Sequence, residues 1–250
     1  MKKGELIEEG EKYIRWFSQL TKDDTKLAGG KGANLGEMTK AKIPVPQGFV
    51  ITTEGYSYFL EKTGLKDEIY RILSKIDIEN TDELDEVSAR IKKKVNEAEM
   101  PEDLQEAVIE NYETMNIDKD VMERASSDAL SILKKGYEPV FVAVRSSATA
   151  EDGGEASFAG QQETFLNTKG RTDLLEAIKK CWASLFASRS IYYRIKKGFK
   201  HEDVLICVVI QMMVNSDKSG VIFSQDPVEH GDNVVVEAVF GLGEGVVSGL

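Results

Sequence analysis

Two nearly continuous apolar runs constrain the fold of this chain most strongly: VFVAV at residues 140–144 and VLICVVIQMMV at residues 204–214. Both runs are short and rich in β-branched residues, which favours strands over helices. The second run contains almost no polar residue, and such a strand is typical of a sheet that is covered on both faces. The sequence therefore predicts a buried sheet.

Helical patterns fill much of the remaining sequence. From residue 53 to residue 135, charged residues alternate with apolar ones at helical intervals, and about four amphipathic helices are predicted there. The clearest apolar stripe consists of Leu84, Val87, Ile91 and Val95. Residues 172–197 carry a second long helical pattern, in which Trp182 is predicted to be a core residue. The predicted fold class is thus α/β, or α+β.

The chain is strongly acidic, with a formal net charge of −11 over 250 residues. A field of this sign repels nucleic acids and anionic membrane surfaces, so neither is predicted as a partner. No apolar run approaches the roughly 20 residues that cross a bilayer. The two cysteines, Cys181 and Cys207, indicate no disulfide framework. We therefore expect a cytoplasmic protein, in which an anionic ligand needs a local pocket of positive charge.

The apolar run at 140–144 is predicted to end at Arg145, which begins a stretch of small residues extending to Gly160. A loop of glycine, serine and alanine lets backbone N–H groups approach an anion closely, and a guanidinium offers a planar fork of donors for phosphate oxygens. These features predict a polyphosphate cradle. The alternative is an ordinary surface loop whose arginine pairs with a carboxylate at the end of the strand.

A second glycine-rich segment surrounds Lys31 in the sequence GGKGANLGEM at residues 29–38. Residues 33–38 are predicted to begin a helix, which places Lys31 near a helix N-terminus, where anions are stabilised. The segment is not a Walker P-loop, because glycine rather than serine or threonine follows the lysine. The alternative is a simple turn without a ligand.

Four motifs occur in order along the chain. They are GGKGANLGEM at 29–38 with VPQGF at 45–49, RSSA at 145–148 with SFAGQQET at 157–164, SQDP at 224–227, and GLGE at 241–244. Together they resemble the N-terminal nucleotide-binding domain of the phosphoenolpyruvate synthase (pyruvate, water dikinase) family, in the wider group of pyruvate phosphate dikinases. The resemblance extends over essentially all 250 residues. The segment SFAGQQET is similar to the version of this motif that is found in the synthases and in rifampin phosphotransferases. It differs from the methionine-rich version of the motif in the dikinases.

The resemblance implies an ATP-grasp-like nucleotide-binding fold. Residues 1–210 are expected to form a first lobe that is largely complete, with a helical insert at about 54–135 and the phosphate loop at 145–167. Residues 211–250 are expected to form the hinge and the start of a second, truncated lobe.

The resemblance also implies which residues bind the nucleotide phosphates. Lys31 and Arg145 match the family's lysine and arginine that contact the phosphates, so both are predicted to be catalytic as well as nucleotide-binding. Their charges suit phosphoryl transfer, which is catalysed mostly by positioning and by stabilising charge on the phosphate oxygens. Gly160, Gln161 and Thr164 match the glycine-rich loop that closes over the phosphates.

The family's strand that receives the adenine ring of ATP corresponds here to the end of the second apolar run, with Gln211, Met212 and Val214. The family's Mg²⁺ ligands are acidic residues on strands beyond the last glycine-rich motif, so no metal ligand is assigned within this sequence. The domains that carry the phosphorylated histidine and bind pyruvate are also expected outside it. The two histidines present, His201 and His230, are predicted to be structural or exposed.

The function implied by the resemblance is ATP binding within a phosphoenolpyruvate synthase. Such an enzyme converts ATP, pyruvate and water to phosphoenolpyruvate, AMP and phosphate through a phosphohistidine. The 250 residues alone are not expected to complete this cycle. One alternative is an antibiotic phosphotransferase of the rifampin type, which shares the same loop. Another is a nucleotide-binding module that keeps the glycine-rich loops but has no catalytic activity.

Overall fold

The computed structural model describes residues 3–117, 138–149, 163–228 and 231–248, together with positions 129 and 136. The chain divides into two compact units, Met1–Met213 and Val214–Leu250. The first unit contains, in chain order, α1 (Lys3–Glu11), β1 (Ile14–Trp16), the short 3-10 helix η1 (Phe17–Gln19), α2 (Thr25–Lys40), β2 (Gly48–Ile51), α3 (Thr53–Lys62), α4 (Leu65–Leu73), α5 (Thr81–Glu97), α6 (Glu102–Thr114), β3 (Val142–Ala148), β4 (Thr164–Thr168), α9 (Arg171–Ser184), α10 (Ser188–Lys196), η2 (His201–Asp203) and β5 (Ile206–Met212).

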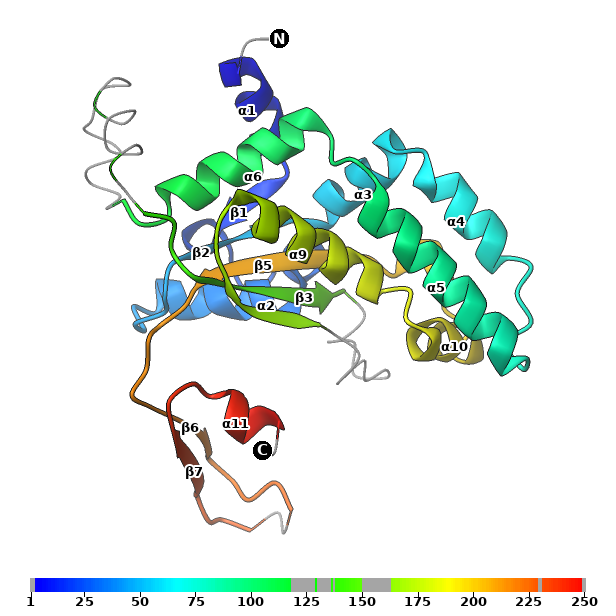
Figure 1. The fold of residues 1–250 in the computed structure, drawn as a ribbon. Coiled ribbons are helices and arrows are strands. Elements are labelled where there is room, and N and C mark those ends of the chain that lie inside the picture. Colours follow the sequence, from blue (N-terminus) through cyan, green and yellow to red (C-terminus); the bar gives the residue numbers. More distant parts are fainter. Residues whose placement is uncertain are drawn as a thin grey trace. The chain divides into compact units, whose positions relative to one another are not determined.

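A five-stranded sheet with the order β1-β2-β5-β3-β4 forms the centre of the first unit (Figure 1). Each pair of neighbouring strands is antiparallel. β5 corresponds to the second apolar run of the sequence, lies in the middle of the sheet and is buried from Ile206 to Ile210. The predicted mixture of helices and a buried sheet is therefore confirmed.

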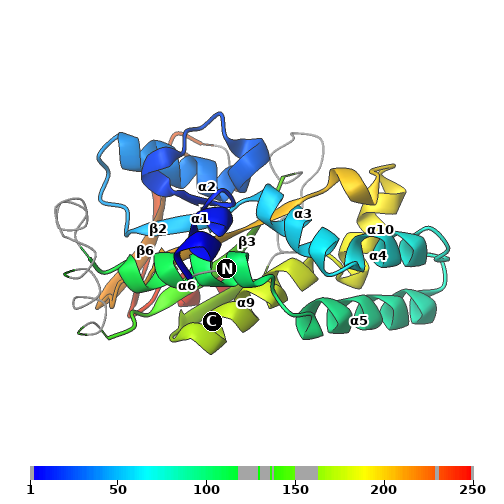
Figure 2. The same cartoon turned by 90° about the horizontal axis from the view of Figure 1, so that it is seen from above.

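The two faces of this sheet support two separate cores (Figures 1 and 2). On one face, η1 and α2 cover a small core. Its buried members are Phe17, Leu20, Ala28, Leu35, Val50, Cys207 and Val209. The larger core on the other face is built with α3, α6 and α9 among its helices, and Trp182 is fully buried there with its ring stacked on Phe59. Trp182 is thus a core residue, as predicted.

The helix α2 is interrupted at Gly29, whose backbone angles of φ 63° and ψ 172° are not helical. A second helical segment therefore starts after Gly29, and the predicted helix start at residue 33 is too late. Glycine is needed here for two reasons. A positive φ disfavours other residues, and a Cβ atom would lie only 2.3 Å from Ser147 Oγ and 2.9 Å from Cys207 Sγ.

The strand that contains Arg145 is longer than the sequence predicts. β3 continues to Ala148, and its backbone pairing places Arg145 opposite Val209 and Ser147 opposite Cys207 of β5. The prediction that the strand ends at Arg145 is wrong, because pairing with a central strand continues through residues that have little β-propensity of their own. Most of the predicted phosphate loop, from 150 to 162, lies outside the described residues.

Four helices, α3 to α6, follow β2 in the segment from Thr53 to Thr114. The helical pattern predicted at 172–197 is divided between α9 and α10, which are separated at residues 185–187. Within the described ranges, no helix combines the length and the apolar character that are needed to cross a membrane.

A buried cation on α10 has a histidine as its partner. The Arg194 side chain is only 1% exposed, and its Nε donates a hydrogen bond to Nδ1 of His201 at 3.1 Å. Burial, and secondly the charge of Arg194, lower the pKa of His201 to about 4. Burial also lowers the pKa of Arg194 to about 10, so the arginine remains charged at neutral pH. His201 is therefore a neutral structural residue, in agreement with its predicted role.

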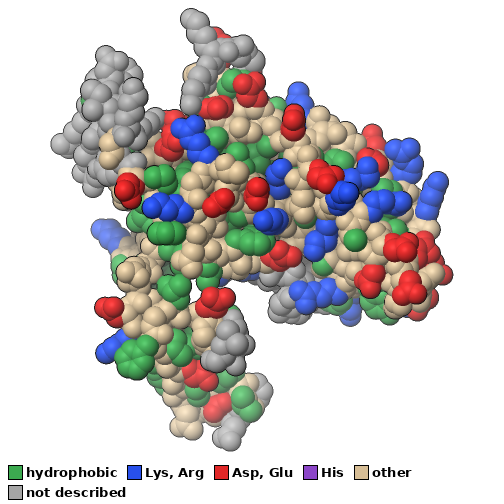
Figure 3. All heavy atoms as spheres, in the orientation of Figure 1, with side chains coloured by type: hydrophobic (Ala, Val, Ile, Leu, Met, Phe, Trp, Pro, Cys, Tyr) green, Lys and Arg blue, Asp and Glu red, His purple; other side chains and the backbone are tan. Residues whose placement is uncertain are grey.

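The second unit is small. β6 (Lys218–Phe223) and β7 (Val235–Phe240) form a two-stranded antiparallel sheet, and α11 (Glu244–Ser248) follows. Several large apolar side chains of this unit are exposed, among them Phe240 at 87% and Ile222 at 71%. Figure 3 shows hydrophobic side chains gathered on its visible face.

The close packing of α2 predicts that Gly36→Ala destabilises the protein. A Cβ atom at this position would lie 2.6 Å from Leu20 Cβ and 2.7 Å from the Leu20 carbonyl oxygen, so the helix has to move away from the residue that follows η1. Overpacking of this kind costs roughly 1–3 kcal/mol. Urea unfolding should show that loss. Gly4→Ala is the matched control, because Gly4 is also helical but a Cβ atom there would meet no other atom within 4 Å; equal stability changes in both variants would contradict the packing argument.

The contact between Arg194 and His201 predicts a loss of stability in acid. The folded-state pKa of about 4 lies below the ordinary histidine value, so the unfolded chain binds the proton more readily. The stability that depends on a neutral His201, which is set first by burial and then by the charge of Arg194, is complete above about pH 6.5 and is lost as the pH falls toward about 4.

His201→Gln keeps an acceptor for Arg194 but removes the titrating group. We expect the difference in unfolding free energy between the wild type and this variant to shift in favour of the variant as the pH is lowered. All other ionisable groups are shared by both proteins, so their effects cancel to first order. Parallel pH profiles for the two proteins would contradict the assigned contact.

Candidate functional site

Arg145 and Thr164 lie on the face of the sheet that α2 covers. The register of β3 places Arg145 opposite Val209 on one side and opposite Thr164 of β4 on the other. Paired residues in antiparallel strands point to the same face, and Val209 belongs to the small core under α2. The predicted phosphate-binding residues of β3 and β4 therefore share one face.

The backbone of Lys31 is joined to the same strand. Lys31 lies in the first turn after the interruption of α2, and its N–H donates a hydrogen bond to Ser147 Oγ at 3.3 Å. Ser147 follows Arg145 by two residues in β3, so both side chains point to the same face. The structure thus connects the segments of Lys31 and Arg145, which the sequence separates by more than a hundred residues.

The exposure of these side chains is suited to a ligand in solution. Lys31 and Arg145 are half-buried, and Thr164 is exposed. Within the part of the chain that the structure describes, no hydrogen bond or ion pair engages the Arg145 guanidinium, in contrast to the buried and histidine-bonded Arg194. The turn that contains Lys31 also begins a helical segment, whose first N–H groups favour an anion.

Two of the three predicted adenine-binding residues, Gln211 and Met212, lie at the end of β5 and point to opposite faces of the sheet. Gln211 is opposite Gly48 and Ala143 on the α2 side, and its Nε2 donates to the Pro46 carbonyl oxygen at 3.4 Å. Met212 points the other way and packs against the larger core. Val214 belongs to the second unit and is 59% exposed.

The two remaining predicted residues, Gly160 and Gln161, lie outside the described residues. For a metal, no cluster of three or more His, Cys, Asp or Glu side chains occurs among the positions that the structure describes. Ser147 is a contact residue that sequence reasoning missed as such, although it belongs to the RSSA motif. A serine after an arginine gives no signal of a partner on a distant helix.

Comparison with known proteins agrees with these motifs. Residues 25–250 match the family described as the pyruvate phosphate dikinase AMP/ATP-binding domain. A probable phosphoenolpyruvate synthase of Methanothermobacter thermautotrophicus is 47% identical over 238 residues, which are 95% of this chain and 32% of the relative. The corresponding protein of Archaeoglobus fulgidus is 48% identical and is covered to 29%.

A phosphoenolpyruvate synthase of Pyrococcus furiosus is 41% identical over 271 aligned residues, which cover 95% of this chain and 31% of that protein. The chain thus spans about a third of the length of the relatives that it matches. By the match to residues 25–250, the chain belongs to the family of pyruvate phosphate dikinase AMP/ATP-binding domains.

Proposed function

We propose that this chain is the ATP-binding part of a phosphoenolpyruvate synthase (pyruvate, water dikinase). The observation that carries the proposal is the hydrogen bond from the Lys31 N–H to Ser147, because it brings the turn of Lys31 to the strand and the sheet face of Arg145. The names of the relatives favour the synthase over an antibiotic phosphotransferase. Membership in an AMP/ATP-binding family opposes the interpretations of the Arg145 segment as an ordinary surface loop and of the Lys31 segment as a simple turn.

In this proposal Lys31 and Arg145 hold the phosphates of ATP. The guanidinium binds two oxygens at once, whereas the ammonium acts as a compact charge. Both stabilise the negative charge that spreads over the transferred group. Thr164 supports the phosphates from β4, and the roles of Gly160 and Gln161 in a covering loop stay predictions from the resemblance.

At the end of β5, Gln211 binds the polar edge of adenine through its side-chain amide. Met212 does not reach adenine with its side chain, which packs against the larger core on the other face of the sheet. It holds the end of β5 in place, because its N–H donates to the Gln47 carbonyl oxygen at 2.8 Å. The role of Val214 stays a prediction from the resemblance.

The remaining chemistry is assigned to the rest of a longer protein of the cytoplasm. The relatives are about three times as long as this chain, which leaves room for domains that carry a phosphohistidine and bind pyruvate. Mg²⁺ would neutralise negative charge on the phosphates when bound, and we assign most of its ligands to the same additional sequence. The ATP-grasp-like division into a first lobe at 1–210 and a second lobe from 211 likewise stays a proposal.

Titration with ATP tests the assignment. We expect the isolated chain to bind ATP, measured by calorimetry with and without Mg²⁺, and we expect Lys31→Gln and Arg145→Gln each to weaken binding at least roughly tenfold, the usual effect of losing a charged contact. Lys26→Gln is the matched control, since Lys26 is an exposed lysine of the same helix. Binding that neither substitution weakens would contradict the site, and so would a folded wild type that binds no ATP.

Activity assays test whether the other catalytic steps need the additional domains. We expect no steady conversion of pyruvate by the isolated 250 residues, because the phosphohistidine and the pyruvate site are assigned to other domains. Coupled detection of phosphoenolpyruvate is a suitable measurement, with the full-length enzyme as the positive control. Sustained turnover by the isolated chain would overturn this assignment while leaving the ATP site intact.

A further inference from the structure

A groove between α4 and α5 is not used by the proposed function. Its volume is about 460 Å³, within the range of small-molecule sites. Figures 1 and 2 both place these two helices beside α10 and away from α2. Neither Lys31 nor Arg145 lines the groove.

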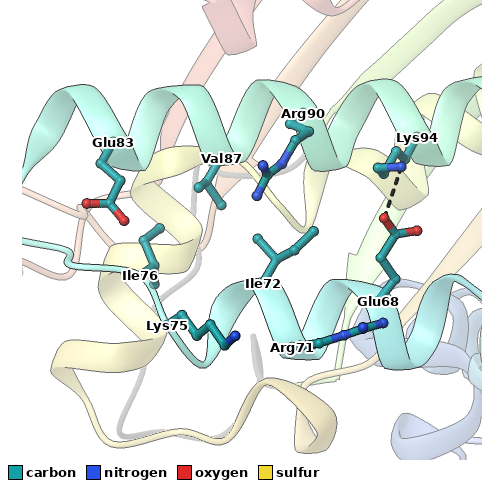
Figure 4. Close-up of a pocket in the computed structure, with 9 residues that line it drawn as sticks. All are labelled: Glu68, Arg71, Ile72, Lys75, Ile76, Glu83, Val87, Arg90 and Lys94. Carbon is teal, nitrogen blue, oxygen red and sulfur yellow. Dashed lines mark ion pairs between the residues drawn. The ribbon is translucent and has the colours of Figure 1, made fainter.

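Apolar side chains form the middle of the groove. Ile72 projects from α4 toward α5, Val87 faces it from α5, and Ile76 follows α4 (Figure 4). The lining positions of α5 recur at helical intervals from Glu83 to Lys94, so one face of the helix is turned to the groove along its length. Val87 itself belongs to the buried core, so the apolar surface that remains for a ligand comes from the half-buried Ile72 and Ile76.

Positive charge surrounds this apolar surface. The lining contains four cations, Arg71, Lys75, Arg90 and Lys94, and two carboxylates, Glu68 and Glu83, which gives a net charge of +2. This charge is unusual in a chain whose formal net charge is −11. Figure 4 shows Arg90 reaching from α5 toward α4, where Arg71 and Lys75 lie.

Three of the four cations lack a partner among the described residues. Lys94 forms an ion pair with Glu68 at 3.0 Å, which closes one end of the groove. In the described ranges, no ion pair or hydrogen bond engages the side chain of Arg71, Lys75 or Arg90. Like charges that face one groove repel each other, and an anion bound between them removes that repulsion.

We propose that this groove binds a phosphate monoester with an apolar body. Arg71 and Arg90 supply guanidinium groups that suit the phosphate oxygens, and the apolar body lies on the half-buried Ile72 and Ile76. The proposal does not depend on the ATP site, because the two sites share no residue.

Calorimetry with 1-naphthyl phosphate tests the proposal. We expect binding of one equivalent that weakens as salt is added. The double variant Arg71→Gln with Arg90→Gln should lose roughly tenfold or more in affinity, because two charged contacts are removed. The double variant Arg71→Lys with Arg90→Lys should keep part of the affinity for the probe, since the positive charge remains.

Matched controls separate a built site from general electrostatics. Lys40→Gln with Lys93→Gln removes the same charge from exposed positions outside the groove and should leave the affinity unchanged. Lys31→Gln with Arg145→Gln should also bind the probe as the wild type does, which keeps this test separate from that of the ATP site. Inorganic phosphate should bind more weakly than the naphthyl ester.

Four results would overturn the proposal. They are an absence of probe binding by the folded wild type, an affinity that the double arginine-to-glutamine variant does not change, an equal loss in the Lys40 and Lys93 control, and binding of inorganic phosphate as tight as that of the ester. Circular dichroism is the check that each variant is folded. The substituted arginines are exposed, so we expect their replacement to leave the fold intact.

Discussion

The packing of α2 on β3 and β5 is the contact on which the candidate site depends. At Gly29 the helix backbone approaches Ser147 and Cys207 so closely that a single methyl group does not fit. The same approach brings the Lys31 N–H to Ser147 Oγ. Arg145 lies two residues before Ser147 on the same strand face. A small shift of α2 would therefore change the separation of the two cations as well as the core beneath them, which couples the stability of this core to the geometry of the site.

The sequence predicts the buried strands and the core tryptophan well, because apolar composition and burial are directly linked. It predicts less well where a strand ends. Ser146, Ser147 and Ala148 have little intrinsic preference for a strand, but β5 offers each of them a backbone partner, and this long-range pairing decides their conformation. The space at Gly29 is similarly limited by the distant Ser147 and Cys207, and a local pattern carries no information about those neighbours.

The candidate site shows the same limit. Lys31 and Arg145 are recognisable because each lies in a glycine- or serine-rich motif, but only the register of the sheet shows that Arg145 and Thr164 share a face. Register also separates Gln211 from Met212, since neighbouring residues of a strand point to opposite faces. A motif names the residues of a site, whereas antiparallel pairing decides which of them can reach one ligand.

Three environments of arginine explain how an acidic chain can present anion sites. Arg194 is buried and donates a hydrogen bond to His201, so its charge is not accessible to a ligand in solution. Arg145 is half-buried at a sheet face, where partial loss of water strengthens a contact with phosphate. Arg71 and Arg90 are exposed and line one groove from the two neighbouring helices α4 and α5. The net charge of −11 repels anions at long range, and binding therefore depends on the few places where the fold gathers cations against a partly dehydrated surface.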